Sequence, residues 1–369
     1  MMNIKGKIYN KMPLNLKIKL DIKSKVKNID QKEIIFCNKN PRVFIIGESD
    51  NGNIGDLAIT RAHYQMIKKN VNENTQIIRI LYSNFWEYFN FLKKNIRSCD
   101  LITIPGGGNI GDVYIEAESI RQIIINEFKN NEIIIFPSTI FFSDKSSTNE
   151  LYKRSLKIYN SHRNLTIYAR EKYSFDILRS LYSNAKIHLV PDIVFKYKFN
   201  NKEIKRENKV LLCLRNDTEK KITSEETQAL LKTCDQKFLK TIHTDTFIEN
   251  VYAVEDSYRD LIINKKLKEF STAKLIITDR LHGMVLSYIT KTPCIVFANY
   301  NYKIKGVYKW IEKDENIFFA DDVEKAIEKI NNFCEKNEYI FNVNLQFDYK
   351  ILEKQIINWK LKHEAQKNI

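Results

Sequence analysis

The chain has 369 residues, enough for about two domains that each bury a hydrophobic core. Its 43% hydrophobic residues, 10 Gly and 6 Pro are typical of a globular protein. No apolar run approaches the roughly 18 residues of a membrane-spanning helix, and the N-terminus lacks the apolar core of a secretory signal. We therefore expect a cytoplasmic protein.

The net charge of +15 suggests partners that carry negative charge. The signatures of nucleic-acid recognition are missing and the lysines are spread along the chain, so nucleic acid is not an expected partner. Anionic substrates or the anionic inner face of the cytoplasmic membrane fit the charge equally well. The six cysteines are scattered, without Cys-x-x-Cys or His at ligand spacing, so we expect reduced thiols and no metal site.

Residues 1–40 form a basic N-terminal extension with ten lysines. Apolar and charged residues alternate from Leu16 to Lys23, a pattern that favours a strand. One interpretation is a basic surface that rests on phospholipid headgroups. The other is a solvated edge strand, and the sequence leaves both open.

Residues 41–195 are predicted to form a Rossmann-like domain. A β-branched strand at 43–46, a glycine-containing polar loop and a helix from about residue 57 to 69 predict the first crossover of a doubly wound sheet. Glycine-rich residues 106–112 are predicted to be a second loop at a strand end. Further strands are expected at 77–81, 101–104, 133–136, 166–169 and 187–190, and helices at 113–128, at 151–159 and after residue 171.

Residues 196–206 are polar and lack an apolar period, which predicts an interdomain linker. Residues 207–345 are predicted to form a second Rossmann-like domain and residues 346–369 a C-terminal helix. The fold class is therefore α/β, with a cleft between two domains. In the second half we expect strands at 210–214, 240–243, 276–278 and 294–297, helices at 224–234, 260–270, 284–289, 323–337 and 351–362, and a loop at 299–305.

The segment from Ile276 to Gly283 predicts a strand, a tight turn and a helix. Arg280 and His282 then lie at the carboxyl end of a strand beside a helix N-terminus, where open α/β sheets bind anionic ligands. A guanidinium and an imidazole in this position suit an anionic substrate that exchanges a proton. Taken alone, the motif is better explained by an Arg280 ion pair and a His282 that caps or packs, and only the other motifs of the chain favour the functional interpretation.

Similar polar motifs follow other expected strands, and their order along the chain resembles the polysaccharide pyruvyl transferase family. The resemblance runs from about residue 43 to 310. Ala298 and Tyr302 depart from the residues common in the family at those positions. The matching motifs are Asn53-Ile54-Gly55-Asp56, Gly106-Gly107-Gly108-Asn109-Ile110-Gly111-Asp112, Pro137-Ser138, Ala169-Arg170-Glu171, Pro191-Asp192, Leu214-Arg215-Asn216, Thr278-Asp279-Arg280-Leu281-His282-Gly283, Pro293, Asn299 and Lys303.

This resemblance implies a glycosyltransferase-B-like (GT-B-like) arrangement of the two domains. It also implies an enzyme that moves the enolpyruvyl group of phosphoenolpyruvate onto a sugar of a cell-surface polysaccharide or its lipid-linked precursor. The products would be a pyruvate ketal and inorganic phosphate, with phosphoenolpyruvate as co-substrate and no other cofactor. Peripheral contact with anionic inner-leaflet lipids would fit a lipid-linked acceptor.

The residues agree with this chemistry. Phosphoenolpyruvate carries a phosphate and a carboxylate, so its site needs several fixed cations, and Arg binds such groups bidentately. The expected cations are Arg170, Arg215, Arg280 and Lys303.

His282 is the expected acid that protonates the methylene carbon, since imidazole titrates near neutrality. The base for the sugar hydroxyl is expected to be Asp56 or Asp112, with Asp192 as a further alternative. Asp279 either orients Arg280 or His282 or caps the following helix. Residues expected to bind the acceptor are Asn53, Gly55, Gly107, Gly108, Asn109, Asp192 and Asn299.

Two other classes of function remain open. A nucleotide-sugar-dependent glycosyltransferase would share the architecture, although residues 280–303 hold no clear ribose-binding Glu. A non-catalytic scaffold of capsule assembly would use the fold without chemistry. An NAD-dependent dehydrogenase is not expected, because neither glycine loop has the Gly-x-Gly-x-x-Gly spacing.

Overall fold

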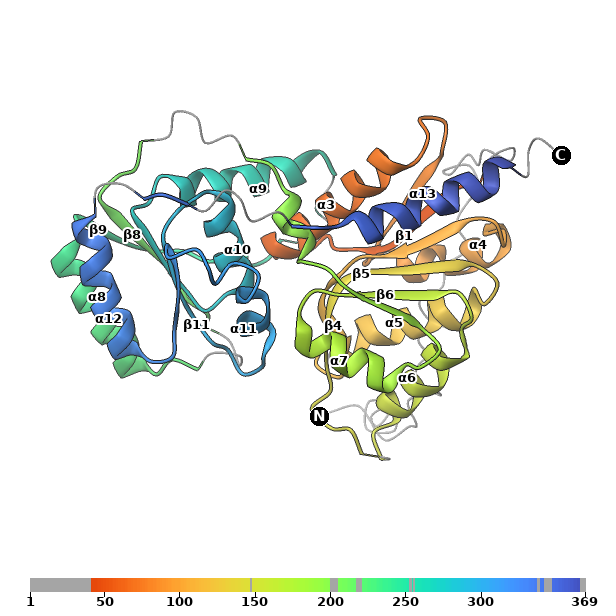
Figure 1. Cartoon of the computed structure of the whole chain (residues 1–369), viewed down its shortest axis with the longest axis horizontal. Helices are drawn as coiled ribbons and strands as arrows, with labels where there is room; N and C mark the ends of the chain where they lie inside the picture. The colour runs from red at the N-terminus through yellow and green to blue at the C-terminus, as the bar shows by residue number, and fades with distance from the viewer. Residues whose placement is uncertain are drawn as a thin grey trace, which may run out of the picture.

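A computed structural model describes residues 41–146, 148–199, 205–216, 221–251, 254, 256–336, 339–341 and 347–365. Two α/β domains lie side by side, and the C-terminal helix lies along the first (Figure 1). The basic extension 1–40 and residues 200–204 of the expected linker lie outside the described part of the chain. In that part, no helix is both long enough and apolar enough to cross a bilayer.

The first domain alternates strands and helices, as its apolar strand segments and glycine-containing loops predict. Its strands β1, β3 and β6 are buried along their whole length or nearly so, as expected for a parallel sheet that is covered on both faces. The elements are β1 (Val43–Glu48), α3 (Ile54–Asn70), β2 (Ile77–Leu81), α4 (Phe85–Asn95), β3 (Leu101–Ile104), β4 (Gly107–Gly111), α5 (Ile115–Glu127), β5 (Glu132–Phe141), α6 (Glu150–Ser161), β6 (Leu165–Ala169), α7 (Lys172–Leu181), β7 (Lys186–Leu189) and the short 3-10 helix η1 (Ile193–Lys196).

The second domain repeats this pattern on a smaller scale. Its central strands are fully buried between helices α8 and α12 on one face and α9 and α10 on the other (Figure 1). The elements are β8 (Lys209–Cys213), α8 (Ser224–Lys237), β9 (Lys240–His243), α9 (Asp256–Ser271), β10 (Leu275–Thr278), α10 (Leu281–Ile289), β11 (Cys294–Phe297), α11 (Lys303–Tyr308), β12 (Ile317–Ala320), α12 (Val323–Glu335) and, after it, α13 (Lys350–Ala365).

The two sheets share one strand order, and this order locates the site. The first sheet runs β2-β1-β3-β5-β6-β7 with β4 paired to β5, and the second runs β12-β11-β10-β8-β9. The direction in which successive strands are added across the sheet therefore reverses between β1 and β3 in one domain and between β8 and β10 in the other, while all these strands remain parallel. Open parallel sheets bind ligands at such reversal points, beyond the carboxyl ends of the strands.

The structure corrects the predicted glycine-rich loop at 106–112. Residues Gly107–Gly111 form β4, which pairs in parallel with β5. Gly107 and Gly111 have φ angles of +131° and +130°, a region that side chains disfavour, so glycine lets the chain bend at both ends of this strand. The predicted strand at 133–136 also extends through Pro137 to Phe141. A register shift between Ile135 and Ser138 accommodates the proline, which has no N–H to donate.

Helices α4 and α11, strand β12 and the 3-10 helix η1 were not predicted either. Helix α4 carries aromatic residues at Phe85, Trp86 and Phe89 that bury one face against the sheet, and such residues favour strands in isolation. Strand β12 was missed altogether. The predicted loop through residue 305 contains the short helix α11, so Lys303 begins a helix.

The C-terminal helix α13 returns to the first domain. Leu352, Ile356 and Trp359 are buried on its inner face, and the indole N–H of Trp359 donates to the Cys99 carbonyl at 3.2 Å. Lys196 pairs with Glu353 at 2.6 Å across the same contact. The sequence predicted the helix, but its amphipathic pattern does not show which domain it covers.

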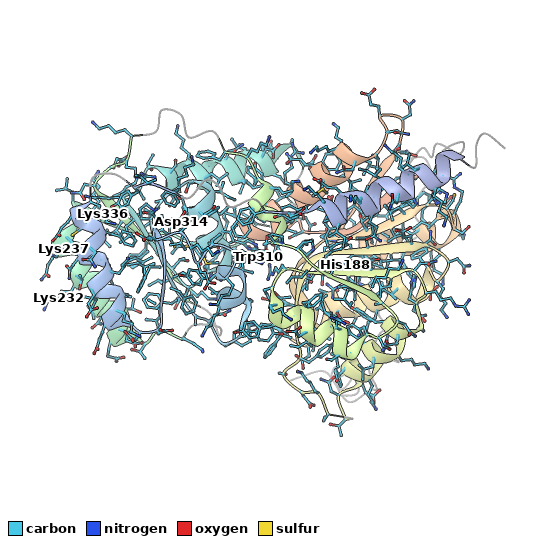
Figure 2. The ribbon with its side chains drawn as sticks, viewed as in Figure 1. His188, Lys232, Lys237, Trp310, Asp314 and Lys336 are labelled. Carbon is cyan, nitrogen blue, oxygen red and sulfur yellow. The ribbon has the colours of Figure 1, made fainter. Side chains whose placement is uncertain are left out.

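The domains touch at separate points. Arg259 of α9 reaches Glu48 at the end of β1, with a nitrogen to oxygen distance of 3.0 Å. The indole N–H of Trp310 donates to the Arg170 carbonyl at 2.8 Å, and Trp310 lies where the second domain meets the first (Figure 2). Lys232, Lys237 and Lys336 lie at the far end of the second domain in the same view.

The described cysteines fit the expectation of reduced thiols. Cys213, Cys234 and Cys294 are buried, whereas Cys99 and Cys334 are partly buried, and all five are free. Burial raises the pKa of Cys213, Cys234 and Cys294 to about 12, which keeps their thiols protonated. These side chains therefore act as small hydrophobic residues.

Candidate active site

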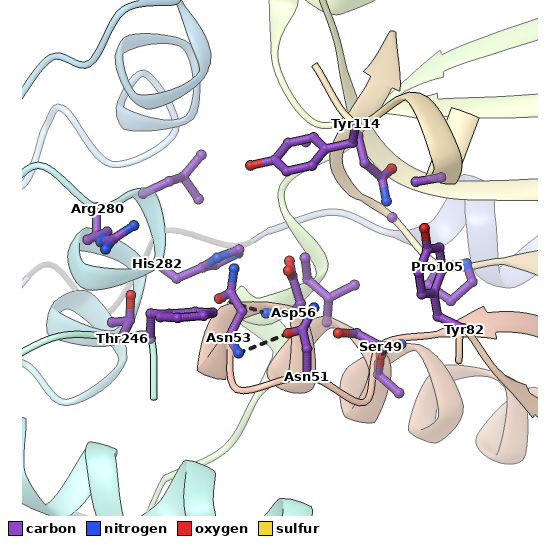
Figure 3. A pocket seen from close by; sticks show the side chains of 18 of the residues that line it. Ser49, Asn51, Asn53, Asp56, Tyr82, Pro105, Tyr114, Thr246, Arg280 and His282 are labelled. Atoms are coloured by element: carbon purple, nitrogen blue, oxygen red, sulfur yellow. Dashed lines mark hydrogen bonds between the residues drawn. The ribbon is translucent and has the colours of Figure 1, made fainter. Parts of the chain in front are cut away.

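A cavity of about 760 Å³ lies between the domains, beyond the carboxyl ends of the strands at both reversal points. Side chains of both domains point into it (Figure 3). The structure brings nine of the fourteen predicted site residues to its wall: Asn53, Asp56, Gly108, Asn109, Arg170, Arg215, Arg280, His282 and Lys303.

His282 lies in the first turn of α10 and faces the first domain. Its Nε2 is 3.7 Å from Oδ2 of Asp192, an ion-pair distance that is longer than a hydrogen bond. The ring packs on Gly55 so closely that an added Cβ at residue 55 would lie 2.0 Å from Nδ1. Position 55 therefore requires glycine, because any side chain there would collide with the imidazole of His282.

Arg170 and Asp192 form a buried pair behind the histidine. Nη1 of Arg170 donates to Oδ2 of Asp192 at 2.8 Å, and its Nε donates to Thr139 at 2.9 Å. Burial alone would raise the pKa of Asp192, but His282, Arg170 and the Val194 amide hold that pKa well below its usual range. Asp192 stays ionised and carries the counter-charge for both cations.

Asp56 stands in the middle of the cavity, in the first turn of α3 (Figure 3). The side chain of Asn53 caps this helix by accepting from the amides of Gly55 at 3.1 Å and Asp56 at 3.4 Å. The Asp56 carboxylate is partly exposed to the cavity and otherwise enclosed, and this burial raises its pKa, with His282, Arg170 and Lys303 opposing the shift. A raised carboxyl pKa in a cleft is typical of groups that transfer protons.

Arg215 and Arg280 follow β8 and β10, which are adjacent strands. The amide of Arg215 donates to Oδ1 of Asp279 at 2.8 Å, and the guanidinium of Arg280 pairs with Asp245 at 2.6 Å. Burial raises the pKa of Asp279 to about 6. Asp279 thus links the ends of β8 and β10. The prediction that Asp279 caps the following helix is wrong, because Arg280 occupies the N-cap position of α10.

Lys303 is held by Asn299. In the amide orientation that satisfies both groups, the Asn299 oxygen accepts from Nζ of Lys303 at 3.2 Å and its nitrogen donates to the Asn301 carbonyl at 2.9 Å. Asn299 is 1% exposed, and it does not line the cavity. The structure therefore places this residue behind Lys303, where it orients the ammonium group, and not in the expected acceptor contact. Tyr302 donates its hydroxyl to the Ile140 carbonyl of the first domain.

Asp112 lies outside the cavity wall. Its carboxylate accepts from the amide of Ser143 at 2.8 Å, from the Ser143 hydroxyl at 2.9 Å and from the amide of Asp144 at 3.2 Å. A carboxylate that anchors another loop in this way is not placed to act as a base. The other predicted residues outside the wall are Gly55, Gly107, Asp192 and Asn299, which support it from behind.

Several residues of the cavity wall were not predicted from the sequence. Asp245, Thr246 and Phe247 follow β9, so a search for polar residues after every strand would have found the first of them. Tyr82 directly follows β2 and could have been found in the same way, whereas Tyr114 and Glu116 carry no comparable signal, because aromatic and acidic residues at helix starts are common. The missed residues are Gly47, Ser49, Asn51, Ile59, Thr60, Tyr82, Pro105, Gly106, Tyr114, Ile115, Glu116, Ala117, Asn216, Asp245, Thr246, Phe247, Glu249 and Leu281.

Two Rossmann-like domains with a basic cavity between them define an α/β protein of the GT-B-like class. The family described as polysaccharide pyruvyl transferase matches residues 53–302, and the chain belongs to this family. The matched segment contains every cavity residue named above except Lys303, Gly47, Ser49 and Asn51.

Individual proteins are similar to this chain. General stress protein 30 of Bacillus subtilis is 31% identical over 334 residues, which cover 90% of this chain and 95% of that protein. Pyruvyl transferase 1 of Schizosaccharomyces pombe is 24% identical over 70% of this chain and 66% of its own. A crystal structure of an uncharacterised Klebsiella pneumoniae protein superposes with a TM-score of 0.53 at 20% identity, covering 84% of this chain and 99% of that one, so it shares the fold.

Proposed function

We propose that this member of the family is a phosphoenolpyruvate-dependent pyruvyl transferase. It moves the enolpyruvyl group onto a sugar of a cell-surface polysaccharide or its lipid-linked precursor, forms a pyruvate ketal and releases inorganic phosphate. One observation carries the proposal: Arg170, Arg215, Arg280 and Lys303 converge with His282 on a single cavity. A small molecule with a phosphate and a carboxylate matches that set of charges.

The cations come from both domains, which suits a ligand with two anionic groups. Arg170 is set by its pairing with Asp192, and Lys303 is set by Asn299, so both are fixed before the ligand arrives. Asp279, which directly precedes Arg280, accepts a hydrogen bond from the amide of Arg215 and so links the two strand ends that carry these arginines. Such preorganised charges stabilise the phosphate as it leaves, without rearrangement at the moment of reaction.

The proton transfers follow from the positions of His282 and Asp56. His282 donates a proton to the methylene carbon, which makes the adjacent carbon electrophilic. A sugar hydroxyl adds there and gives its proton to Asp56, which passes it to the phosphate as the carbon–oxygen bond breaks and the phosphate departs. A second hydroxyl of the same sugar closes the ketal on that carbon and returns its proton to the neutral His282. Asp192 stabilises the protonated imidazole from behind at 3.7 Å.

A thermal-shift experiment tests the donor. Phosphoenolpyruvate should raise the unfolding temperature, whereas UDP and GDP should leave it unchanged. Stabilisation by UDP or GDP instead would favour a nucleotide-sugar-dependent glycosyltransferase, which the fold alone does not exclude.

Turnover is tested with phosphoenolpyruvate and a panel of cell-envelope oligosaccharides, by following phosphate release. Replacing His282 with Ala should lower turnover by about 10²- to 10⁴-fold, the usual contribution of a general acid. His243→Ala is the control, because His243 is an exposed residue of β9 outside the cavity. Equal activity of the two variants would argue for a scaffold and against the enzyme.

The same proposal includes peripheral contact with anionic lipids of the inner leaflet. A lipid-linked acceptor would bring the protein to that surface, and the net charge of +15 favours it. Binding of the full chain to anionic vesicles, compared with a chain that starts at residue 41, measures the contribution of the basic extension.

A further inference from the structure

Two apolar loops flank the cavity from opposite domains. Val113, Tyr114 and Ile115 lie at the start of α5 and are called the first lip, and Phe247 and Ile248 follow β9 and are called the second lip. Tyr114 is 47% exposed and Phe247 is 45% exposed, and both line the cavity together with Ile115. Contiguous apolar side chains that stay exposed beside a cavity are typical of surfaces that contact a ligand.

The first lip is fixed in place by Asp112. This carboxylate accepts from the amide and hydroxyl of Ser143 on the neighbouring loop, directly before Val113. Gly111, just before it, has a φ of +130°, and a Cβ there would lie 1.7 Å from the Phe141 carbonyl oxygen. The motif Gly111-Asp112 therefore positions the first lip and not the reacting groups.

The second lip is fixed by backbone pairing across the domains. The amide of Ile248 donates to the Gly52 carbonyl at 2.9 Å, and the amide of Ile54 donates to the Thr246 carbonyl at 2.8 Å. A Cβ at residue 52 would lie 1.9 Å from the Ile248 carbonyl oxygen, so glycine is needed for this approach. Both lips are thus prebuilt, which reduces the entropy lost when a ligand binds.

The cavity has two chemically different ends. Arg280 and His282 lie on one side of Asp56, and Tyr82 and Pro105 lie on the other (Figure 3). At the second end the indole N–H of Trp86 donates to Glu116 at 3.5 Å, and burial together with the Glu116 carboxylate raises the pKa of Tyr82. This end offers aromatic surface and neutral or acidic polar groups, and the charge of the nearby Arg121 is already paired with Glu118.

The size of the cavity calls for a second ligand. A volume of about 760 Å³ is typical of sites for drug-sized molecules, and phosphoenolpyruvate is much smaller than these. The cavity that contains the remaining space is lined by Tyr114, Ile115 and Phe247 of the two lips and by Tyr82. Sugar rings suit it, because their C–H faces pack on aromatic rings while their hydroxyls reach polar groups at the edge. Asn109, Asp245 and Thr246 interrupt the apolar surface, which disfavours a hydrocarbon chain.

We propose that the two lips form a stacking subsite for a sugar ring of the acceptor next to the ring that receives the pyruvyl group. This proposal rests on the proposed function, and it names Tyr114 and Phe247 as the residues that hold the additional ring. The acceptor is accordingly at least a disaccharide, with its reacting sugar beside Asp56.

The test compares Tyr114→Ala and Phe247→Ala with the wild type. Tyr258→Ala is the matched control, because Tyr258 is a 56% exposed aromatic residue of α9 outside the cavity. Binding is measured by saturation-transfer NMR with glucose, galactose and N-acetylglucosamine, and with disaccharides of each, in the absence of phosphoenolpyruvate. Thermal shift with phosphoenolpyruvate is measured in parallel on every variant.

Both lip variants should bind the best disaccharide about tenfold more weakly, the loss expected for one aromatic contact, while Tyr258→Ala should bind it normally. Stabilisation by phosphoenolpyruvate should be unchanged in all three. The subsite is refuted if the lip variants bind as the wild type does, if monosaccharides bind as tightly as disaccharides, or if no sugar of the panel binds. If phosphoenolpyruvate does not raise the unfolding temperature of the wild type, the proposed function is refuted instead. The two failures are therefore distinguishable.

Discussion

At the scale of single residues, the site depends on glycines that make room for charged side chains. Gly55 lies under the imidazole of His282, and Gly108 lies beside the guanidinium of Arg170. The two contacts differ in severity, because an added Cβ would be 2.0 Å from the histidine ring but 3.1 Å from Nη2 of the arginine, which would have to move by only a few tenths of an ångström. Alanine substitutions at the two positions should therefore have different effects.

Gly55→Ala should lower turnover on the order of 10²-fold, since displacing a reacting group by about 1 Å has that effect. Gly108→Ala should mainly raise the KM for phosphoenolpyruvate by a few fold, because Arg170 can shift slightly. Steady-state kinetics measures both, and circular dichroism checks that the helices are intact. Equal effects of the two substitutions would contradict this explanation of the glycines.

Asp192→Asn tests the buried charge behind the site. The folded-state pKa of Asp192 lies below its unfolded value, so its contribution to stability is present above about pH 4 and is lost as the pH falls below that value. The variant leaves Arg170 without its counter-charge and should lose about 3 kcal/mol at pH 7. The difference between variant and wild type should shrink as the pH is lowered from about 5 to 3.

Urea unfolding at several pH values measures this difference. Asp176→Asn is the control, because its pair with Lys172 is exposed and should contribute little. A constant difference at all pH values would show that Asp192 acts through shape and not through charge.

The sequence located the cations better than the residues that support them. Arg170, Arg215 and Arg280 follow strands, and strands of a parallel sheet end at a common edge, so their convergence could be predicted. Asn299 and Asp112 stand in similar motifs, yet their partners are Lys303 and Ser143. The hydrogen-bond partner of a side chain depends on distances in the folded structure, and these distances cannot be read from the spacing of residues in a motif.

At the scale of elements, helix α13 offers the clearest stability test. Trp359→Ala removes a 3% exposed indole that packs on the first domain and donates to Cys99, and it should cost about 3 to 5 kcal/mol of unfolding free energy. Leu361→Ala on the outer face is the control, since Leu361 is 52% exposed and its loss should change stability by less than about 0.5 kcal/mol. Chemical denaturation measures both. A small effect of Trp359→Ala would mean that α13 is not part of the first domain's core.

Most strands of both sheets could be predicted because their apolar runs are short, β-branched and bounded by polar loops. Strand β4 could not, because its sequence Gly-Gly-Asn-Ile-Gly has the composition of a turn and becomes a strand only by pairing with β5. Helix α4 could not be predicted either, because its many aromatic residues favour a strand. In each case tertiary contacts overrode the local preference of the segment.

At the scale of the whole molecule, the net charge of +15 predicts salt-dependent kinetics. Raising the salt from about 0.05 to about 0.5 M should increase the KM for phosphoenolpyruvate on the order of tenfold, because screening weakens attraction into the basic cavity. The KM for an uncharged disaccharide acceptor should change much less. Steady-state kinetics at matched viscosity separates the two. Equal salt effects on both substrates would indicate a general effect on the protein.

The return of α13 to the first domain has a mechanical consequence. The chain passes from one domain to the other between η1 and β8 and passes back between α12 and α13. Two bodies joined by a pair of links can swing about the line through both links, but they cannot twist freely around a single pivot. We therefore expect any opening of this molecule to follow one hinge axis, so that Arg170 of the first domain and Arg280 of the second should separate and meet again in the same alignment.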